Sequence, residues 1–279
     1  MTTEHTIPVR IVASDLDGTL LAPNHQLSDF TKQTLHQLHQ QGFTFVFATG
    51  RHHIDVAGIR EIAGIPAYMI TANGARVHDL HDQPMYSANV PAELVQAIID
   101  VVKHDDNIYV HIYRDNDWLL SREDKALSDF HADSGFTYQV FDINNAPTQG
   151  IAKLFFTHTQ QDHEQLAKYE HLINQRFAGQ LSVAFSTPWC LEVMGPGVSK
   201  GEALQAVAQS LGLSLEHCIA FGDGMNDVEM LSMAGQGLLM GTAHEKVFRA
   251  LPHNTVIGSH ADDAVAVYLQ QHLLNQETR

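Results

Sequence analysis

The sequence predicts an α/β protein in which a parallel sheet is interrupted by an inserted α+β domain. Strand and helix patterns alternate in the two outer segments, as in βαβ units, and the pattern changes between them. The 279 residues, 44% of them apolar, are enough for one large core or two smaller ones. We therefore predict a core domain of residues 1–84 and 190–279 and an inserted domain of residues 85–189.

The first outer segment begins with a predicted strand, helix and strand. Residues 7–14 form an apolar, β-rich run that ends in the turn-forming sequence DLDGT. Ser28 is expected to begin a helix with Leu35 and Leu38 on one face, and Gly42 to end it. The remaining predictions for this segment are a strand at 43–48, a helix at 51–63, a strand at 68–71 and a turn at 73–74.

The central segment combines predicted strands at 107–114, 136–142, 151–157 and 181–186 with predicted helices at 91–103, 122–133 and 162–176. The βαβ pattern returns after it. The predictions for the last segment are helices at 199–211, 226–234 and 261–273 and strands at 218–222 and 237–240.

The charge balance bears on possible partners and location. The chain has 32 acidic and 16 basic residues, a net charge of −16, which argues against nucleic acid and means that a phosphate site must supply its own positive charge. The two cysteines, Cys190 and Cys218, have no zinc-site spacing, and no window is long and apolar enough for a membrane span. We expect a cytoplasmic protein that does not bind membranes.

Two carboxylates follow the first predicted strand. Asp15 and Asp17 are two residues apart, so both can point toward the edge of the sheet where parallel sheets bind ligands. Together they can hold a cation. The alternative is a structural turn rich in Asp and Gly. An EF-hand loop is excluded by Thr19 and Leu20, which stand where an acid and a glycine are needed.

Three more predicted strand–helix junctions carry polar residues. Thr49 and Gly50 offer a hydroxyl and a backbone amide to phosphate oxygens. Ser199 and Glu202 form a capping box, which places Lys200 in the first turn of a helix, although an exposed surface lysine is the alternative. The last junction, GDGMND, adds Asp223 and Asp227, with Asn226 and Glu229 spaced as a helix cap.

Four such junctions in this order seldom arise by chance. The sequences DLDGT, ATGR, VSKG and GDGMND resemble the four motifs of the haloacid dehalogenase superfamily. The resemblance implies a Rossmann-like core with a C2-type cap, and a Mg²⁺-dependent phosphatase that forms an aspartyl-phosphate. It implies that Asp15 is the nucleophile and Asp17 the general acid and base. The implied metal ligands are Asp15, the backbone carbonyl of Asp17 and Asp223, with Asp227 as an orienting or water-mediated ligand. The implied phosphate-binding residues are Thr49, Gly50, Lys200 and Asn226.

The large insertion is similar to the cap of the Cof subfamily, which acts on small phosphorylated metabolites. The segments HIYRDNDW, SGFTYQV, CLEVM and CIAFGDGMND resemble hydroxymethylpyrimidine diphosphate phosphatases of that subfamily, which belong to thiamin metabolism. Ser14 departs from the pattern, because an apolar residue is usual before the nucleophile. The resemblance implies a small phosphorylated metabolite as partner, and we expect a monomer or a weak dimer.

Recognition of the leaving group is expected from the insertion. His111, Tyr113 and Trp118 lie in a predicted strand pair and can offer aromatic faces to a heterocycle, with core packing as the alternative. Trp189 and the 190–194 strand are expected to act as a hinge. Three other functions stay open: a broad-specificity phosphatase for sugar phosphates, nucleotides and pyridoxal phosphate, a phosphotransferase or mutase, and a regulator without turnover.

Overall fold

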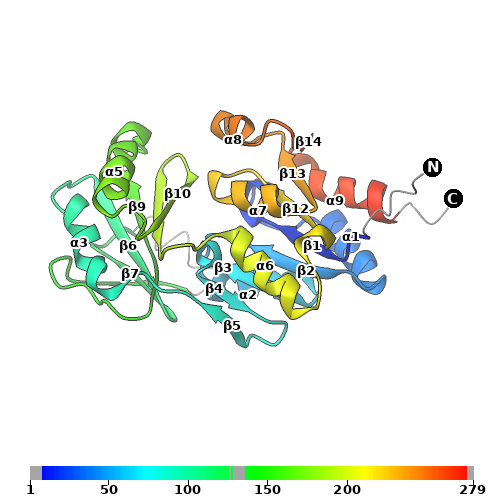
Figure 1. Ribbon diagram of the computed structural model, residues 1–279, viewed down its shortest axis with the longest axis horizontal. Coiled ribbons are helices and arrows are strands. Elements are labelled where there is room, and N and C mark those ends of the chain that lie inside the picture. Colours follow the sequence, from blue (N-terminus) through cyan, green and yellow to red (C-terminus); the bar gives the residue numbers. More distant parts are fainter. Residues whose placement is uncertain (1–7, 126, 128–135, 275–279) are drawn as a thin grey trace.

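The computed structural model describes residues 8–125, 127 and 136–274, which form two sheets in two adjoining units (Figure 1). The larger sheet has the order β14-β13-β12-β1-β2-β3-β4-β5. Its strands are β1 (Ile11–Ser14), β2 (Thr44–Ala48), β3 (Ala67–Thr71), β4 (Arg76–His78), β5 (Pro84–Ser87), β12 (Cys218–Gly222), β13 (Gln236–Met240) and β14 (Thr255–Ile257).

The strands from β14 to β3 are parallel, and the last two strands are antiparallel. Ile11 of β1 pairs with Cys218 on one side and with Thr44 on the other, so β1 lies inside the sheet. The chain reverses after β3 because Asn73 and Gly74 adopt positive φ angles of 58° and 103°. The predicted parallel sheet is therefore extended by an antiparallel hairpin.

Helices cover both faces of this sheet. Three of them, α1 (Asp29–Gln40), α2 (His53–Ala63) and α9 (Ala264–Leu269), pack on one face, and α6 (Lys200–Ser210), α7 (Val228–Met233) and α8 (Glu245–Ala250) on the other. Buried apolar side chains alternate between the two faces of β1 and β2, and each set joins one helix layer. The result is a core of three layers, with the predicted parallel strands between two layers of helices.

The smaller sheet has the order β10-β11-β9-β6-β7-β8. Its strands are β6 (Ile108–Arg114), β7 (Asp117–Leu120), β8 (Tyr138–Val140), β9 (Ile151–His158), β10 (Ser182–Thr187) and β11 (Cys190–Met194). Helices α3 (Ala92–Val102) and α5 (His163–Arg176) pack on one face. Side chains on the opposite face pack with Ala72 and Ala75 of the larger unit, so this face is turned toward the core.

The predicted fold class is confirmed, but the boundaries of the insertion need two corrections. Residues 84–87 pair in the larger sheet as β5, although residues from 85 were assigned to the insertion. The Cys190–Met194 strand was assigned to the core as a hinge, yet it pairs with β9 and β10 inside the smaller sheet. Leu191 and Val193 are buried beneath the helices of that sheet, which explains the strand's position.

Other elements differ at their ends. Helix α9 begins at Ala264, after Asp263 in a left-handed conformation, and a wider turn over Gln270–Leu274 continues it. The short elements α8 and β14 were not predicted. Most of the helix predicted at 122–133 lies outside the described residues. In the described part of the chain, no helix combines the length and apolar character needed to cross a membrane.

Candidate active site

The loop after β1 brings two of the predicted acids together. Asp15 follows the strand directly and is buried. Gly18 has a φ of +80°, and a Cβ there would lie 2.6 Å from Oδ2 of Asp223. Only glycine allows this approach, and it lets the Thr19 hydroxyl donate a 2.7 Å hydrogen bond to Oδ1 of Asp223. The loops after β1 and β12 are thus in direct contact.

Lys200 lies between two carboxylates. Helix α6 begins after Ser199, whose Oγ accepts a 3.1 Å hydrogen bond from the Glu202 amide, and this cap fixes Lys200 in the first turn. The Lys200 side chain is fully buried, and its Nζ donates to Oδ1 of Asp15 at 2.6 Å and to Oδ1 of Asp227 at 2.7 Å. The alternative of an exposed surface lysine is therefore wrong.

Asp227 orients the loop after β12. Its Oδ2 accepts hydrogen bonds from the backbone amides of Asp223 at 3.0 Å and Gly224 at 2.8 Å. The prediction that Asn226 caps the next helix is wrong. Asn226 lies in a tight turn before α7, and its Nδ2 donates to Oδ1 of Asn73 at 3.0 Å. The turn is stabilised by the Asp227 carboxylate instead.

Asp15, Asp223 and Asp227 form a compact carboxylate cluster. One oxygen of each lies within 4.8 Å of the others. Burial raises the pKa of Asp15 well above its usual value, against the opposing charge of Lys200. Burial, followed by the charge of Asp227, raises the pKa of Asp223 to about 6. One ammonium does not balance three acids, and a divalent cation with oxygen ligands fits this donor set.

Asp17 points to different partners. Arg51 donates to both of its carboxylate oxygens, at 2.7 and 2.5 Å, and His25 Nδ1 lies 3.0 Å from Oδ1. Burial acts to raise the pKa of Asp17, but hydrogen bonds from Arg51 and His25 outweigh it and hold that pKa well below its usual range. The Asp17 side chain is thus an ion-pair partner here. Arg51 stands in the ATGR motif, whereas no local sequence pattern points to His25.

The predicted phosphate-binding loop is connected to the smaller sheet. Thr49 is buried, and its Oγ1 accepts a 3.2 Å hydrogen bond from the Arg51 amide. The Gly50 carbonyl accepts a 2.6 Å hydrogen bond from Nζ of Lys153 on β9. Helix α2 begins at His53 rather than at Arg51, so Thr49 and Gly50 precede the helix by a turn.

Lys153 continues this connection through a buried ion pair with Glu192 of β11. Oε2 of Glu192 accepts a 2.6 Å hydrogen bond from Asn73, whose Oδ1 accepts the bond from Asn226. We call these four residues, Lys153, Glu192, Asn73 and Asn226, the inter-sheet network. Lys153 and Glu192 were not predicted, because nothing in their local sequences distinguishes them from strand residues.

The three predicted recognition residues are buried. His111 and Trp118 are each 2% exposed and Tyr113 is 7% exposed. The Trp118 Nε1 donates to Nδ1 of His111 at 3.3 Å, and the His111 ring stacks on Phe155 with centroids 4.2 Å apart. These contacts correspond to the core-packing alternative.

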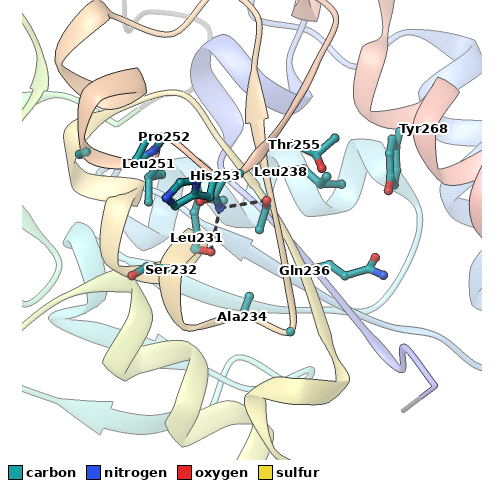
Figure 2. A pocket seen from close by; sticks show the side chains of 14 residues that line it. Leu231, Ser232, Ala234, Gln236, Leu238, Leu251, Pro252, His253, Thr255 and Tyr268 are labelled. Atoms are coloured by element: carbon teal, nitrogen blue, oxygen red, sulfur yellow. Dashed lines mark hydrogen bonds between the residues drawn. The ribbon is translucent and has the colours of Figure 1, made fainter. Parts of the chain in front are cut away.

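Two cavities bear on the location of the site. One, of about 460 Å³, lies between β10 and the loops after β12 and β13, and Asp223 and Gly224 line it. Figure 2 shows another, of about 550 Å³, lined by residues such as Gln236 and Thr255 at the amino ends of β13 and β14. The carboxylates lie at the opposite, carboxyl ends of the strands, so the first cavity belongs to the candidate site.

Comparison with known proteins decides the family. Residues 12–269 match the sequence profile of the haloacid dehalogenase-like hydrolases. The chain belongs to that family. A protein of Cronobacter sakazakii named HMP-PP phosphatase is 41% identical over 260 residues, which cover 93% of this chain and 94% of that protein. The predicted superfamily and the predicted type of enzyme, a phosphatase, are therefore confirmed.

Two further comparisons support the same family. The HMP-PP phosphatase of Yersinia pseudotuberculosis is 39% identical to this haloacid dehalogenase-like hydrolase over 264 residues, with 95% of each chain covered. A solved haloacid dehalogenase-like hydrolase from B. subtilis superimposes with a TM-score of 0.80 at 25% identity, covering 95% of this chain and 100% of that one. The likeness thus extends over both sheets.

Proposed function

We propose that the chain is a Mg²⁺-dependent phosphatase that removes the terminal phosphoryl group of hydroxymethylpyrimidine diphosphate and releases the monophosphate. The observation that carries this proposal is the buried Lys200 between Asp15 and Asp227, with Asp223 in the same cluster. The two bacterial relatives are both named HMP-PP phosphatase, and this name supports hydroxymethylpyrimidine diphosphate (HMP-PP) as the substrate. We propose a cytoplasmic location, with the eight-stranded unit as catalytic core and the six-stranded unit as cap.

The proposed metal ligands are Asp15, Asp223 and the backbone carbonyl of Asp17. Both oxygens of Asp227 are already engaged, by Lys200 and by two backbone amides, so Asp227 would act on the ion through water or by orienting Asp223. Bound Mg²⁺ would neutralise charge on the phosphoryl oxygens and allow an anionic nucleophile to approach them.

Asp15 supplies the nucleophile. Its Oδ1 is held by Lys200, and among the described residues no hydrogen bond reaches its Oδ2, which is the proposed attacking atom. The bond from Oδ2 to phosphorus forms while the bond from phosphorus to the leaving oxygen breaks. Water then attacks the aspartyl-phosphate, the bond between Oδ2 and phosphorus breaks, and inorganic phosphate leaves.

The remaining motif residues hold the phosphoryl group and move protons. The Thr49 hydroxyl, the Gly50 and Asn226 amides and the Lys200 ammonium are the proposed donors to the phosphoryl oxygens. Asp17 is the proposed acid and base, and it must leave its ion pair with Arg51 to carry a proton. The leaving oxygen of a diphosphate departs as a phosphate with a pKa of about 6, so it needs little protonation.

A phosphate-release screen tests the function. The substrates are hydroxymethylpyrimidine diphosphate, sugar phosphates, nucleotides and pyridoxal phosphate, each with chelator, Mg²⁺ or Ca²⁺. We expect release only with Mg²⁺ and fastest from the pyrimidine diphosphate, because the longer bonds of Ca²⁺ would misplace the carboxylate. Asp15→Asn should release nothing. Full activity in chelator, or activity of Asp15→Asn equal to wild type, would refute the mechanism.

The same screen separates the other functions. Similar rates on all substrates would indicate a broad-specificity phosphatase. Phosphate transfer to an added sugar hydroxyl would indicate a phosphotransferase, and no release from any substrate would indicate a regulator without turnover.

A further inference from the structure

We propose that the cavity beside Asp223 binds the leaving group, and that it recognises a heteroaromatic ring carrying a phosphate, with Trp189 against the ring and Lys246 on the phosphate. This inference rests on the proposed function and assigns residues to its specificity. It also replaces His111, Tyr113 and Trp118, which are buried, as the predicted recognition residues.

The cavity adjoins the carboxylate cluster at Asp223. Asp223, a member of the cluster, lines it together with Gly224 and Met225 of the same loop. The opposite wall comes from β10 and the turn that joins it to β11, and its volume of about 460 Å³ suits a small metabolite. A substrate whose phosphoryl group reaches Asp15 can therefore extend its other end into this space.

Two large apolar side chains remain exposed in this lining. Trp189, at the turn before β11, is 43% exposed, and Met225 is 37% exposed. An aromatic face and a thioether that line the same cavity offer apolar contact surface to a flat ring. A bound ring can therefore reach the exposed Trp189, whereas the buried Trp118 is not accessible to it.

Lys246 is the cation in this lining, which also contains the acids Glu170 and Asp223. Lys246 Nζ lies 3.1 Å from Nε2 of His163, and Nδ1 of His163 lies 2.8 Å from the Pro188 carbonyl oxygen. Because a carbonyl only accepts, Nδ1 carries the proton and Nε2 accepts from Lys246. Nδ1 of His244 accepts from the Lys246 amide at 3.2 Å, which leaves its Nε2–H as a donor.

Lys246 is positioned to bind an anion. Among the described residues it forms no ion pair, although the chain has a net charge of −16. Because Lys246 lines the cavity and no carboxylate of the described residues lies within ion-pair distance of it, its charge is available to a phosphate bound there. When the terminal phosphoryl group of a diphosphate is transferred, the bridging oxygen leaves with the inner phosphate, so the leaving group is an anion that needs such a cation.

Steady-state kinetics test the assignment. We compare kcat/KM for hydroxymethylpyrimidine diphosphate with that for acetyl phosphate, which lacks both the ring and the second phosphate. The ratio should fall at least about tenfold in Lys246→Gln, from loss of a charged hydrogen bond. It should fall about two- to twelvefold in Trp189→Ala, from loss of a stacked ring. Lys168→Gln, an exposed lysine on α5 outside the lining, is the matched control.

A binding measurement adds a readout that does not depend on turnover. The chain has two tryptophans, so titration with hydroxymethylpyrimidine monophosphate should quench fluorescence in wild type and in Trp118→Phe but not in Trp189→Phe. Unchanged ratios in both pocket variants, or quenching that persists in Trp189→Phe, would overturn this inference while leaving the phosphatase intact. A wild type that releases phosphate from neither substrate would instead overturn the proposed function.

Discussion

At the scale of single residues, Lys200 has the clearest dual role. A fully buried ammonium is tolerated only when it is paired, and here two carboxylates pair with it. The same contacts orient Asp15 and hold Asp227 against the loop after β12. We therefore expect stability and the proposed catalysis both to depend on this residue, and experiment can separate the two.

Lys200→Met should lower both activity and stability. We expect kcat to fall by about 10²–10³, as for loss of one preorganised donor, and the free energy of unfolding to fall by about 3–5 kcal/mol because two buried acids lose their partner. Urea unfolding and phosphate release measure the two effects. The double variant Lys200→Met/Asp227→Asn should regain part of the stability and none of the activity. Recovery of activity would show that Lys200 only packs.

Asp17→Asn tests the acid–base role through the leaving group. The rate of phosphoryl transfer to Asp15 should fall more for an alkyl monophosphate, whose alkoxide must be protonated, than for the diphosphate, whose leaving phosphate has a pKa of about 6. Single-turnover release of the leaving group measures this first step apart from hydrolysis of the aspartyl-phosphate, which is the same for both substrates. Equal losses in the first step would show that Asp17 matters there through its ion pair with Arg51 rather than through protonation of the leaving group.

His52 should make stability dependent on pH. It is 3% exposed, and burial followed by the charge of His53 lowers its pKa from 6.5 to about 3. Below about pH 6.5 the unfolded chain therefore binds a proton that the folded chain does not bind. The contribution of neutral His52 to the free energy of unfolding is complete above pH 6.5 and is lost as pH falls toward 3. We expect the free energy of unfolding to be about 2 kcal/mol lower at pH 5 than at pH 7.

Urea unfolding at both pH values measures the His52 effect. His52→Gln should flatten the difference, whereas His104→Gln, on an exposed histidine, should leave it unchanged. An undiminished difference in His52→Gln would assign the pH dependence to other groups.

The sequence predicted the three clustered acids but not all their partners. Asp15, Asp223 and Asp227 follow from strand ends and turn residues, which are local signals. The pair between Asp17 and Arg51 joins residues 34 apart, and the bond from Asn73 to Glu192 joins residues 119 apart. Such contacts depend on how distant segments pack, so local patterns cannot specify them.

At the scale of elements, strands and helices with strong apolar periodicity were predicted closely. The strand Cys218–Gly222 has the predicted bounds, and Ser28 and Ser199 begin their helices as expected. The strand Cys190–Met194 was assigned to the wrong sheet because alternation shows that a strand has two faces, not which sheet it joins. Helix α8 and strand β14 have six and three residues, too short for a periodic signal.

The loop between Asp15 and Leu20 should tolerate no side chain at Gly18. In Gly18→Ala the new Cβ would meet Asp223 Oδ2 at 2.6 Å, in a backbone conformation with φ of +80°. Asp223 must then shift within the carboxylate cluster, so we expect Mg²⁺ affinity to fall at least about tenfold with a smaller change in stability. Isothermal titration with Mg²⁺ measures this. Gly42→Ala, with a φ of +87° but open space around it, controls for backbone strain alone.

At the scale of the whole molecule, the inter-sheet network connects the two sheets to the candidate site. Lys153 contacts the loop of Thr49 and Gly50, and Glu192 contacts Asn73, which in turn holds Asn226. Both strand residues lie on the face of the smaller sheet that is turned toward the core, and both are about 2% exposed. The cap sheet thus makes buried polar contacts with loops that carry predicted phosphate-binding residues.

This arrangement predicts that activity and stability respond differently to changes in Lys153 and Glu192. Glu192→Leu alone leaves a buried ammonium unpaired and should lower the free energy of unfolding by about 3–5 kcal/mol. The double variant Glu192→Leu/Lys153→Met removes both charges and should recover most of that stability, because a buried ion pair contributes little over apolar packing. It should still lose kcat, since Asn73 and Asn226 lose the carboxylate that positions them. Urea unfolding and phosphate release on the same preparations compare the two quantities. Wild-type kcat in the double variant would mean that the network only joins the sheets, whereas a stable variant with reduced kcat would show that the cap sheet positions the catalytic loops.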